Sequence, residues 1–191
     1  MSAREETIQI VSFSTNNTNC NPNDIFNILL EQYTHTIVKK SRHIITFTLV
    51  LPDTVQTTKI MMCSILNLNR EYTGITDVNC YLIFIDLQCE NSKDSFDSIL
   101  SYAQNYCDLN KKIYALGIFN KENDTKQKIS KGDIKKIMDS GKLNYEYIEI
   151  NLVKKEEVAD ILLNILSSSS KESSREEGKT EDKQANSCIV L

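Results

Sequence analysis

Two short, nearly continuous apolar runs constrain the fold of this 191-residue chain more than any other feature of its sequence. They are Cys80–Leu87 and Ile113–Phe119, and each is too short to cross a membrane as a helix, which takes about 20 residues. Runs of this length are typical of strands that are buried on both faces of a sheet. Because such a sheet needs helices on both sides, the two runs predict an α/β fold.

Helical segments alternate with strands along the first 166 residues. The helices show apolar residues three or four positions apart, and two of them have strong start signals. Asn21 stands before Pro22, and Ser130 stands three residues before Asp133, as expected for helix caps. We predict four helices, which begin near Asn21, Asn91, Ser130 and Lys154.

Six segments rich in β-branched and aromatic residues are predicted strands. They are Thr7–Phe13, His43–Leu51, Thr57–Leu68, Cys80–Leu87, Ile113–Phe119 and Tyr145–Ile150. The short connection around Pro52 predicts an antiparallel pair. The order of elements predicts a doubly wound, mostly parallel six-stranded sheet with one antiparallel edge strand. A ligand would then bind beyond the carboxyl ends of the strands, in the loops after Phe13, Leu68, Phe119 and Ile150.

The composition changes sharply after Leu166. Residues 167 to 187 contain no Ile, Leu, Val or aromatic residue, and are rich in Ser, Lys and Glu. Such a segment buries too little apolar surface to offset the entropy that folding removes. We therefore predict a folded domain over residues 1–166 and a disordered tail over residues 167–191.

Charge and motif content argue against several classes of protein. The net charge of −4 gives no basic surface for nucleic acid, so no nucleic-acid partner is expected. The six cysteines form no C-x-x-C pair, which predicts reduced thiols and no metal site. The first strand is followed neither by a Gly-rich turn for a dinucleotide nor by the acidic pair of a phosphoacceptor domain. A nucleophile at Cys20 would have only His35 or His43 as its base, and we predict no catalytic residue.

The order of these elements resembles the Ras superfamily of small GTPases (Ras/Rab-like), which have a P-loop fold. Tyr81–Asp86 resembles the family's fourth strand, and Ser95-Phe96 resembles the opening of its third helix. Asn120-Lys121-Glu122-Asn123 resembles the guanine-reading N-K-x-D motif, and Glu156 stands where the last helix of the family begins. The resemblance covers residues 5 to 166 and continues into the tail. It implies a site for GTP or GDP with Mg²⁺.

The phosphate loop of the family, G-x-x-x-x-G-K-[ST], corresponds to residues 14 to 21 of this chain. Ser14 and Asn19 stand at its two glycines, Cys20 at its lysine and Asn21 at its hydroxyl residue. In the family, the lysine neutralises phosphate charge and the hydroxyl residue binds magnesium. A neutral thiol at Cys20 supplies no positive charge.

The other nucleotide motifs have changed as well. No Asp occurs between Ile60 and Thr76, where the family carries D-x-x-G. Asn120 and Lys121 match N-K-x-D, but Asn123 replaces the carboxylate that accepts two hydrogen bonds from guanine. We therefore predict a pseudo-GTPase, in which the fold is kept while GTP binding and hydrolysis are weak or lost. The alternative is a divergent active GTPase that binds nucleotide through backbone contacts. Thr36 is the candidate equivalent of the switch threonine.

The sequence ends in Cys188-Ile189-Val190-Leu191, which fits the C-a-a-X prenylation box. A terminal Leu selects geranylgeranyl, and the lipid would be attached to Cys188. This predicts a prenyltransferase and a prenyl-binding chaperone as partners. One lipid without a polybasic run anchors weakly, so we expect the protein to cycle between the cytosol and the cytoplasmic face of a membrane. An effector-like protein would supply further affinity, and the resemblance implies a role in vesicle trafficking or signalling.

Overall fold

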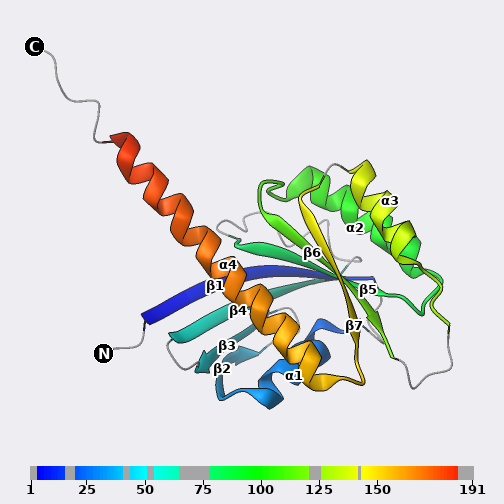
Figure 1. Ribbon diagram of the computed structural model, residues 1–191, viewed down its shortest axis with the longest axis horizontal. Helices are drawn as coiled ribbons and strands as arrows, with labels where there is room; N and C mark the ends of the chain where they lie inside the picture. Colours follow the sequence, from blue (N-terminus) through cyan, green and yellow to red (C-terminus); the bar gives the residue numbers. More distant parts are fainter. Residues whose placement is uncertain are drawn as a thin grey trace, which may run out of the picture.

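The computed structural model describes residues 4–15, 20–40, 44–50, 54–64, 78–120, 126–141 and 143–184. These residues form a twisted seven-stranded sheet with helices on both faces (Figure 1). The strands are β1 Arg4–Ser14, β2 His35–Lys40, β3 Ile44–Val50, β4 Thr54–Ser64, β5 Cys80–Asp86, β6 Lys112–Phe119 and β7 Tyr145–Asn151. The helices are α1 Pro22–Gln32, α2 Ser92–Tyr106, α3 Lys131–Ser140 and α4 Lys155–Gln184.

The strand order across the sheet is β2-β3-β4-β1-β5-β6-β7. β1 pairs in parallel with both β4 and β5, and the parallel pairing continues through β6 to β7. β3 runs antiparallel to both β2 and β4. The α/β class, the mostly parallel sheet and the antiparallel connection around Pro52 are therefore as expected from the sequence.

The prediction of six strands is wrong, because β2 forms an additional edge strand. All six of its residues are exposed. A strand with neither face buried needs no alternation of apolar and polar residues, so His35–Lys40 carried no periodic signal. β3 is the antiparallel strand that the sequence predicts at the edge of the sheet. Because β2 pairs with its outer side, β3 lies between β2 and β4 inside the sheet.

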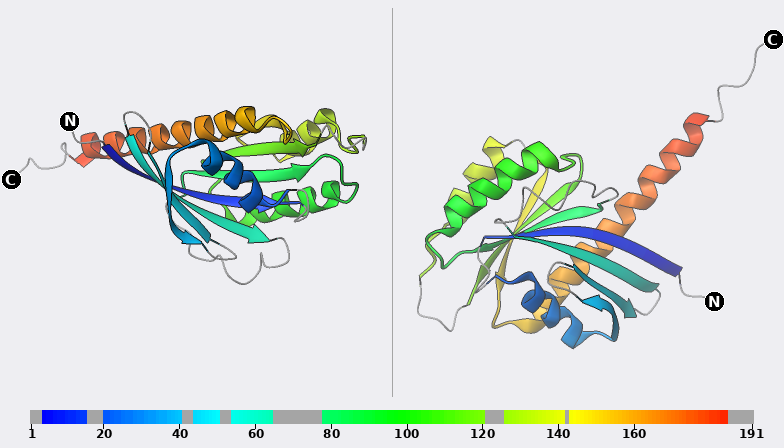
Figure 2. Two further views of the ribbon diagram at one scale, coloured as in Figure 1. Left: turned by 90° about the horizontal axis from the view of Figure 1, so that it is seen from below. Right: turned by 180° about the vertical axis from the view of Figure 1, so that it is seen from behind.

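Helices lie on both faces of the sheet (Figure 2), and an apolar core fills the space on each face. Successive side chains of a strand point to opposite faces, so β5 supplies Leu82 and Phe84 to one core and Ile83 and Ile85 to the other. Helices α1 and α4 cover the first core, and α2 and α3 cover the second. Every residue of β5 is buried, as its continuous apolar run predicted.

Helix caps explain where two of the helices begin. The side chain of Asn21 accepts a hydrogen bond from the backbone N–H of Asn23 at 3.1 Å. Ser130 and Asp133 form a complete capping box at the start of α3, as predicted. At the start of α2, by contrast, the side chain of Asn91 makes no capping hydrogen bond.

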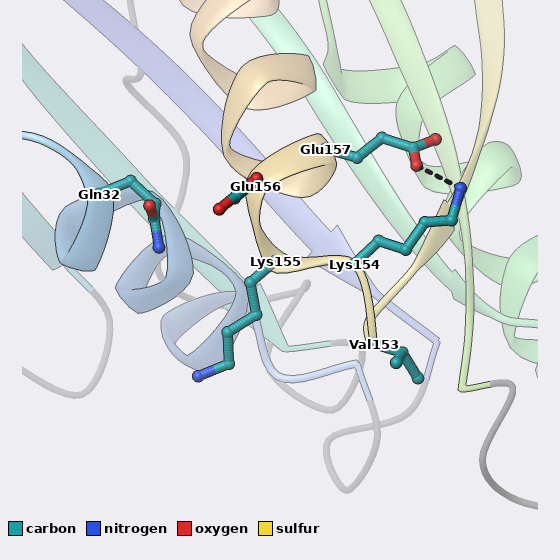
Figure 3. Close-up of a pocket in the computed structure, with 6 residues that line it drawn as sticks. All are labelled: Gln32, Val153, Lys154, Lys155, Glu156 and Glu157. Atoms are coloured by element: carbon teal, nitrogen blue, oxygen red, sulfur yellow. Dashed lines mark hydrogen bonds and ion pairs between the residues drawn. The ribbon is translucent and has the colours of Figure 1, made fainter.

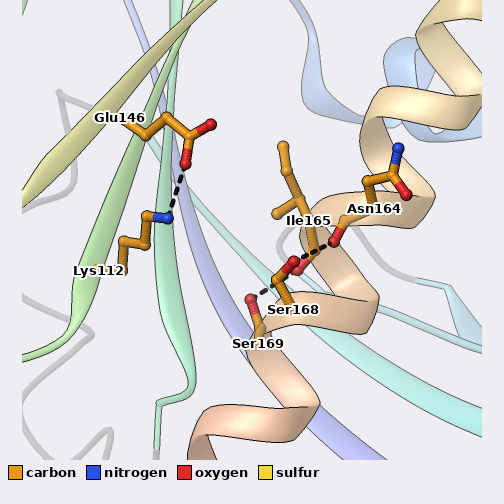
Figure 4. A network of polar contacts seen from close by, with 6 residues as sticks. All are labelled: Lys112, Glu146, Asn164, Ile165, Ser168 and Ser169. Atoms are coloured by element: carbon orange, nitrogen blue, oxygen red, sulfur yellow. Dashed lines mark hydrogen bonds and ion pairs between the residues drawn. The ribbon is translucent and has the colours of Figure 1, made fainter.

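Helix α4 continues past Leu166 to Gln184, into the segment that the sequence predicts to be a tail. The hydroxyls of Ser168 and Ser169 donate to the carbonyls of Asn164 and Ile165, each at 2.8 Å (Figure 4). These local bonds satisfy the serine side chains within the helix. Ser169 is also buried, and its carbonyl accepts a bond from Asn79 Nδ2 at 3.5 Å. The low apolar content of this segment argues against a hydrophobic core formed by its side chains. It does not argue against a helix, because the backbone hydrogen bonds of a helix join residues only four positions apart.

No helix among the described residues is long and apolar enough to cross a membrane. The predicted lipidation site, Cys188, lies outside the described residues.

The side chains of Tyr147 and Leu87 fill the space beside Gly117. A Cβ atom added to Gly117 would lie 2.5 Å from the hydroxyl of Tyr147 and 3.0 Å from Leu87 Cδ1. We expect Gly117→Ala to lower the free energy of unfolding by about 1–3 kcal/mol, the usual cost of overpacking, in urea denaturation. Part of that cost should disappear in a Tyr147→Phe background, where the clashing oxygen is gone.

Gly132→Ala is the matched control for this substitution. The nearest atom to an added Cβ there is Ser130 Oγ at 3.6 Å, and Gly132 lies within α3. Because Ala favours a helix over Gly by about 1 kcal/mol, this control should leave stability unchanged or raise it. Equal losses in the two variants would contradict the packing explanation.

Candidate functional site

The course of the chain through the sheet identifies one place for a ligand. After β1 the chain forms β2, β3 and β4 on one side, and from β5 onward it proceeds to the other side. In an open α/β sheet, ligands bind at this reversal, beyond the carboxyl ends of the strands. The relevant ends here are Ser14 of β1 and Asp86 of β5.

Thr15 joins these two strand ends. Its backbone N–H donates to the carbonyl of Phe84 at 3.0 Å, and its hydroxyl accepts from the backbone N–H of Asp86 at 3.0 Å. The same hydroxyl donates to Ser92 Oγ at 3.1 Å. Thr15 and Ser92 are both buried, so this hydroxyl network fixes the start of the loop after β1 against the start of α2.

Cys20, at the predicted position of the phosphate-loop lysine, lies in the core. It is fully buried, and its carbonyl accepts a 2.6 Å hydrogen bond from Ser14 Oγ. Burial raises the pKa of its thiol far above the ordinary value of 9.0, and the negative charges of Asp86 and Cys89 raise the pKa further. The thiol is therefore neutral at physiological pH and offers neither a cation nor a nucleophilic thiolate.

Asp86 places a carboxylate close to this thiol. The residue is only 1% exposed, and its Oδ1 accepts the backbone N–H of Gln88 at 2.9 Å. A buried carboxylate interacts strongly with other charges, because little water screens it.

Gln88 connects the ends of β5 and β6. Its side-chain amide donates to the carbonyl of Asn120 at 3.1 Å and accepts the backbone N–H of Asn120 at 2.9 Å. Sequence reasoning missed Gln88, Thr15 and Ser92, because each acts through contacts with residues more than 30 positions away. No local motif marks such residues.

Some of the predicted site residues meet in the structure. Ser14 and Cys20 are in direct contact at the end of β1, and Asn21 follows as the cap of α1. The Asn21 side chain is therefore engaged in starting the helix. Asn120 lies at the end of β6, joined to this region through Gln88. The remaining predicted site residues, Asn19, Lys121, Asn123 and Cys188, lie outside the described residues.

Two more of the predicted ligand loops follow Leu68 and Ile150. The loop after Leu68 falls outside the described residues. After β7, the side chain of Asn151 accepts the backbone N–H of Val153 at 3.3 Å. The backbone N–H of Leu152, between these two residues, donates to the carbonyl of Phe119 at 2.9 Å. These bonds hold the start of this loop against the end of β6.

A surface pocket lies elsewhere, between the end of α1 and the start of α4 (Figure 3). Its two lysines are exposed and already paired with carboxylates, Lys154 with Glu157 at 2.7 Å and Lys155 with Glu31 at 3.2 Å. Exposed ion pairs of this kind contribute little to the stability of a fold. None of the residues at the β1–β5 reversal lines this pocket, whose lining is Gln32, Val153, Lys154, Lys155, Glu156 and Glu157.

Within the described part of the chain, no three His, Cys, Asp or Glu side chains gather closely enough to hold a metal ion. No protein-family model matches the chain, and no curated protein is similar to it in sequence. Function must therefore be inferred from the residues that meet at the carboxyl ends of the strands.

The burial of Cys20 predicts its chemical reactivity. At pH 8 we expect iodoacetamide to modify Cys20 at least about 100-fold more slowly in the native protein than in urea, because the native thiol is inaccessible and protonated. The half-buried Cys89 is the internal control and should react in the native state. Peptide mass spectrometry measures both residues in one sample.

The raised pKa of the Cys20 thiol also predicts how the stability of the fold changes at alkaline pH. The native pKa of Cys20 exceeds the ordinary value of 9.0, so the unfolded chain releases this proton first. The stabilising contribution is complete below pH 9 and declines as the pH rises above it. Rapid native alkylation of Cys20 at pH 8 would contradict both the burial and the shift.

Proposed function

We propose that this chain is a small-GTPase-like binding module in which tight GTP binding and hydrolysis have been lost. It would act as a scaffold in vesicle trafficking or signalling, attached by a prenyl group to the cytoplasmic face of a membrane. The observation that carries the proposal is the buried, neutral thiol of Cys20 where the resemblance requires a cation.

The strand arrangement supports the resemblance. Apart from the edge strand β2, the sheet has five parallel strands and one antiparallel strand, as the small-GTPase-like fold implies. Ser14 ends β1, and Cys20 and Asn21 stand between β1 and α1, where the phosphate loop of such a fold belongs.

Electrostatics argue against a bound triphosphate at this place. The contacting side chains of Ser14, Thr15 and Ser92 are neutral hydroxyls, and Cys20 is a neutral thiol. Asp86 adds a buried carboxylate. Phosphoryl transfer depends on cations that neutralise the developing charge, and none of these described side chains is a cation.

A divergent active GTPase is the second candidate. The observation in its favour is Asn120, which keeps the first position of N-K-x-D and whose backbone is held at the end of β6 by Gln88. An enzyme of this kind would obtain its phosphate contacts from backbone N–H groups.

Nucleotide binding separates the two candidates. Purified full-length protein is titrated into fluorescent GDP and GTP, with and without Mg²⁺, beside an active small GTPase as the positive control. We expect no submicromolar binding and no effect of Mg²⁺, because the cation at position 20 is missing. Submicromolar, magnesium-dependent binding by the native chain that weakens in Cys20→Ser would establish the active alternative.

Lipidation is tested in cells with a clickable geranylgeranyl analogue. We expect the native chain to be labelled and to partition between membrane and cytosol, and Cys188→Ser to lose the label and become cytosolic. Leu191→Ser is the matched control, because it keeps the thiol but changes the box to the farnesyl type. Unchanged membrane attachment of Cys188→Ser would refute the proposed anchor.

A further inference from the structure

We infer that the open edge of β2 docks an extended acidic segment of a partner protein, which adds a strand to the sheet. This inference rests on the binding-module part of the proposed function and is independent of the state of the nucleotide site. β2 lies at the border of the sheet (Figure 1), and within the described chain only β3 pairs with it.

The side chains of β2 are exposed to solvent on both faces of the sheet. All six residues of β2 are exposed, including Ile37 at 44% and Val38 at 63%. Strand edges present backbone groups that can pair with another chain, and proteins use such edges to bind extended peptides. Ile37 and Val38 are consecutive in the strand, so each offers an apolar contact to a different side chain of a paired peptide.

The backbone bonding pattern identifies the groups at the open edge. The N–H of Val50 donates to the carbonyl of Thr34 at 2.9 Å, so these two residues form a hydrogen-bonded pair between the strands. Such pairs alternate with non-bonded pairs along an antiparallel ladder. His35 opposes Leu49 and Ile37 opposes Phe47, and these are the non-bonded positions. The backbone N–H and C=O groups of His35 and Ile37 therefore point away from β3.

The charge of the edge selects the occupant. Lys39 and Lys40 end β2, the strand contains no acidic residue, and neither lysine forms an ion pair with another described residue. Pairing two copies through β2 would bring four lysines onto one short ladder, where like charges repel. The register also shifts between Ile37 and Lys39, and such bulges oppose pairing of an edge with itself. An acidic partner gains attraction from the same two lysines.

The order of side chains along β2 predicts the sequence of the partner segment in more detail. Strand neighbours alternate between the two faces of a sheet, so the adjacent lysines project toward opposite faces. A matching segment would run parallel to β2 and carry two consecutive acidic residues beside Lys39 and Lys40, preceded by an apolar residue that packs beside Val38.

The test uses the full chain and a capped peptide, Thr-Val-Thr-Val-Glu-Glu, with NMR-detected amide exchange. We expect the peptide to protect the amides of His35 and Ile37, and to leave that of Thr36, which faces β3, unchanged. Binding should weaken with salt. Exchanging the charge in Lys39→Glu/Lys40→Glu should weaken it by about tenfold or more, whereas Lys135→Glu/Lys136→Glu on α3 is the charge-matched control and should bind as the native chain does.

Two further peptides make the test decisive. A peptide with Lys in place of Glu should not bind, and an N-methylated acidic peptide should not bind because it lacks the strand-forming N–H groups. Absence of binding by the acidic peptide, or equal binding by the N-methylated one, would overturn the inference. Protection of His35 and Ile37 that grows with protein concentration alone would identify a second copy as the occupant and overturn it as well. Each of these results is separate from the nucleotide titration, which can fail or succeed without changing them.

Discussion

Burial of both faces of the central strands is the constraint on which the rest of this structure depends. Every residue of β5 is buried, and its alternating side chains enter two separate cores. Burying one large aliphatic or aromatic side chain stabilises a fold by about 1.5–3 kcal/mol, more than the ~1 kcal/mol of a typical hydrogen bond. The helices must therefore divide between the two faces, and the chain must reverse its direction of winding beside β1.

That reversal brings together the residues that define the candidate site. Thr15, Ser92 and Asp86 meet through short hydrogen bonds, and Ser14 holds the backbone of Cys20. The result is a compact, neutral network beside a buried carboxylate. A phosphate site has the opposite requirements, because it needs free backbone donors and positive charge. The described side chains of this network supply no positive charge.

The two edges of the sheet differ in a way that matters for binding. At β7, the side chain of Lys112 on neighbouring β6 pairs with Glu146 at 2.7 Å (Figure 4), so this lysine is paired within the chain. At β2 the lysines have no such described partner, and the apolar side chains are exposed. A surface with unmet charge and open backbone groups is better suited to a protein partner than to a small molecule.

Local sequence determined much of this protein. The apolar runs marked β5 and β6, and the caps at Asn21 and Ser130 marked the starts of α1 and α3, because burial and capping leave periodic or positional signals. β2 left no signal, since a fully exposed strand has no buried face, and the helical continuation beyond Ser167 was hidden by low apolar content. Only the tertiary structure decided that Gln88 reaches Asn120, that Thr15 bridges to Asp86 and that Cys20 is buried. Such contacts join residues far apart in the chain, and their existence depends on how the strands are ordered in space.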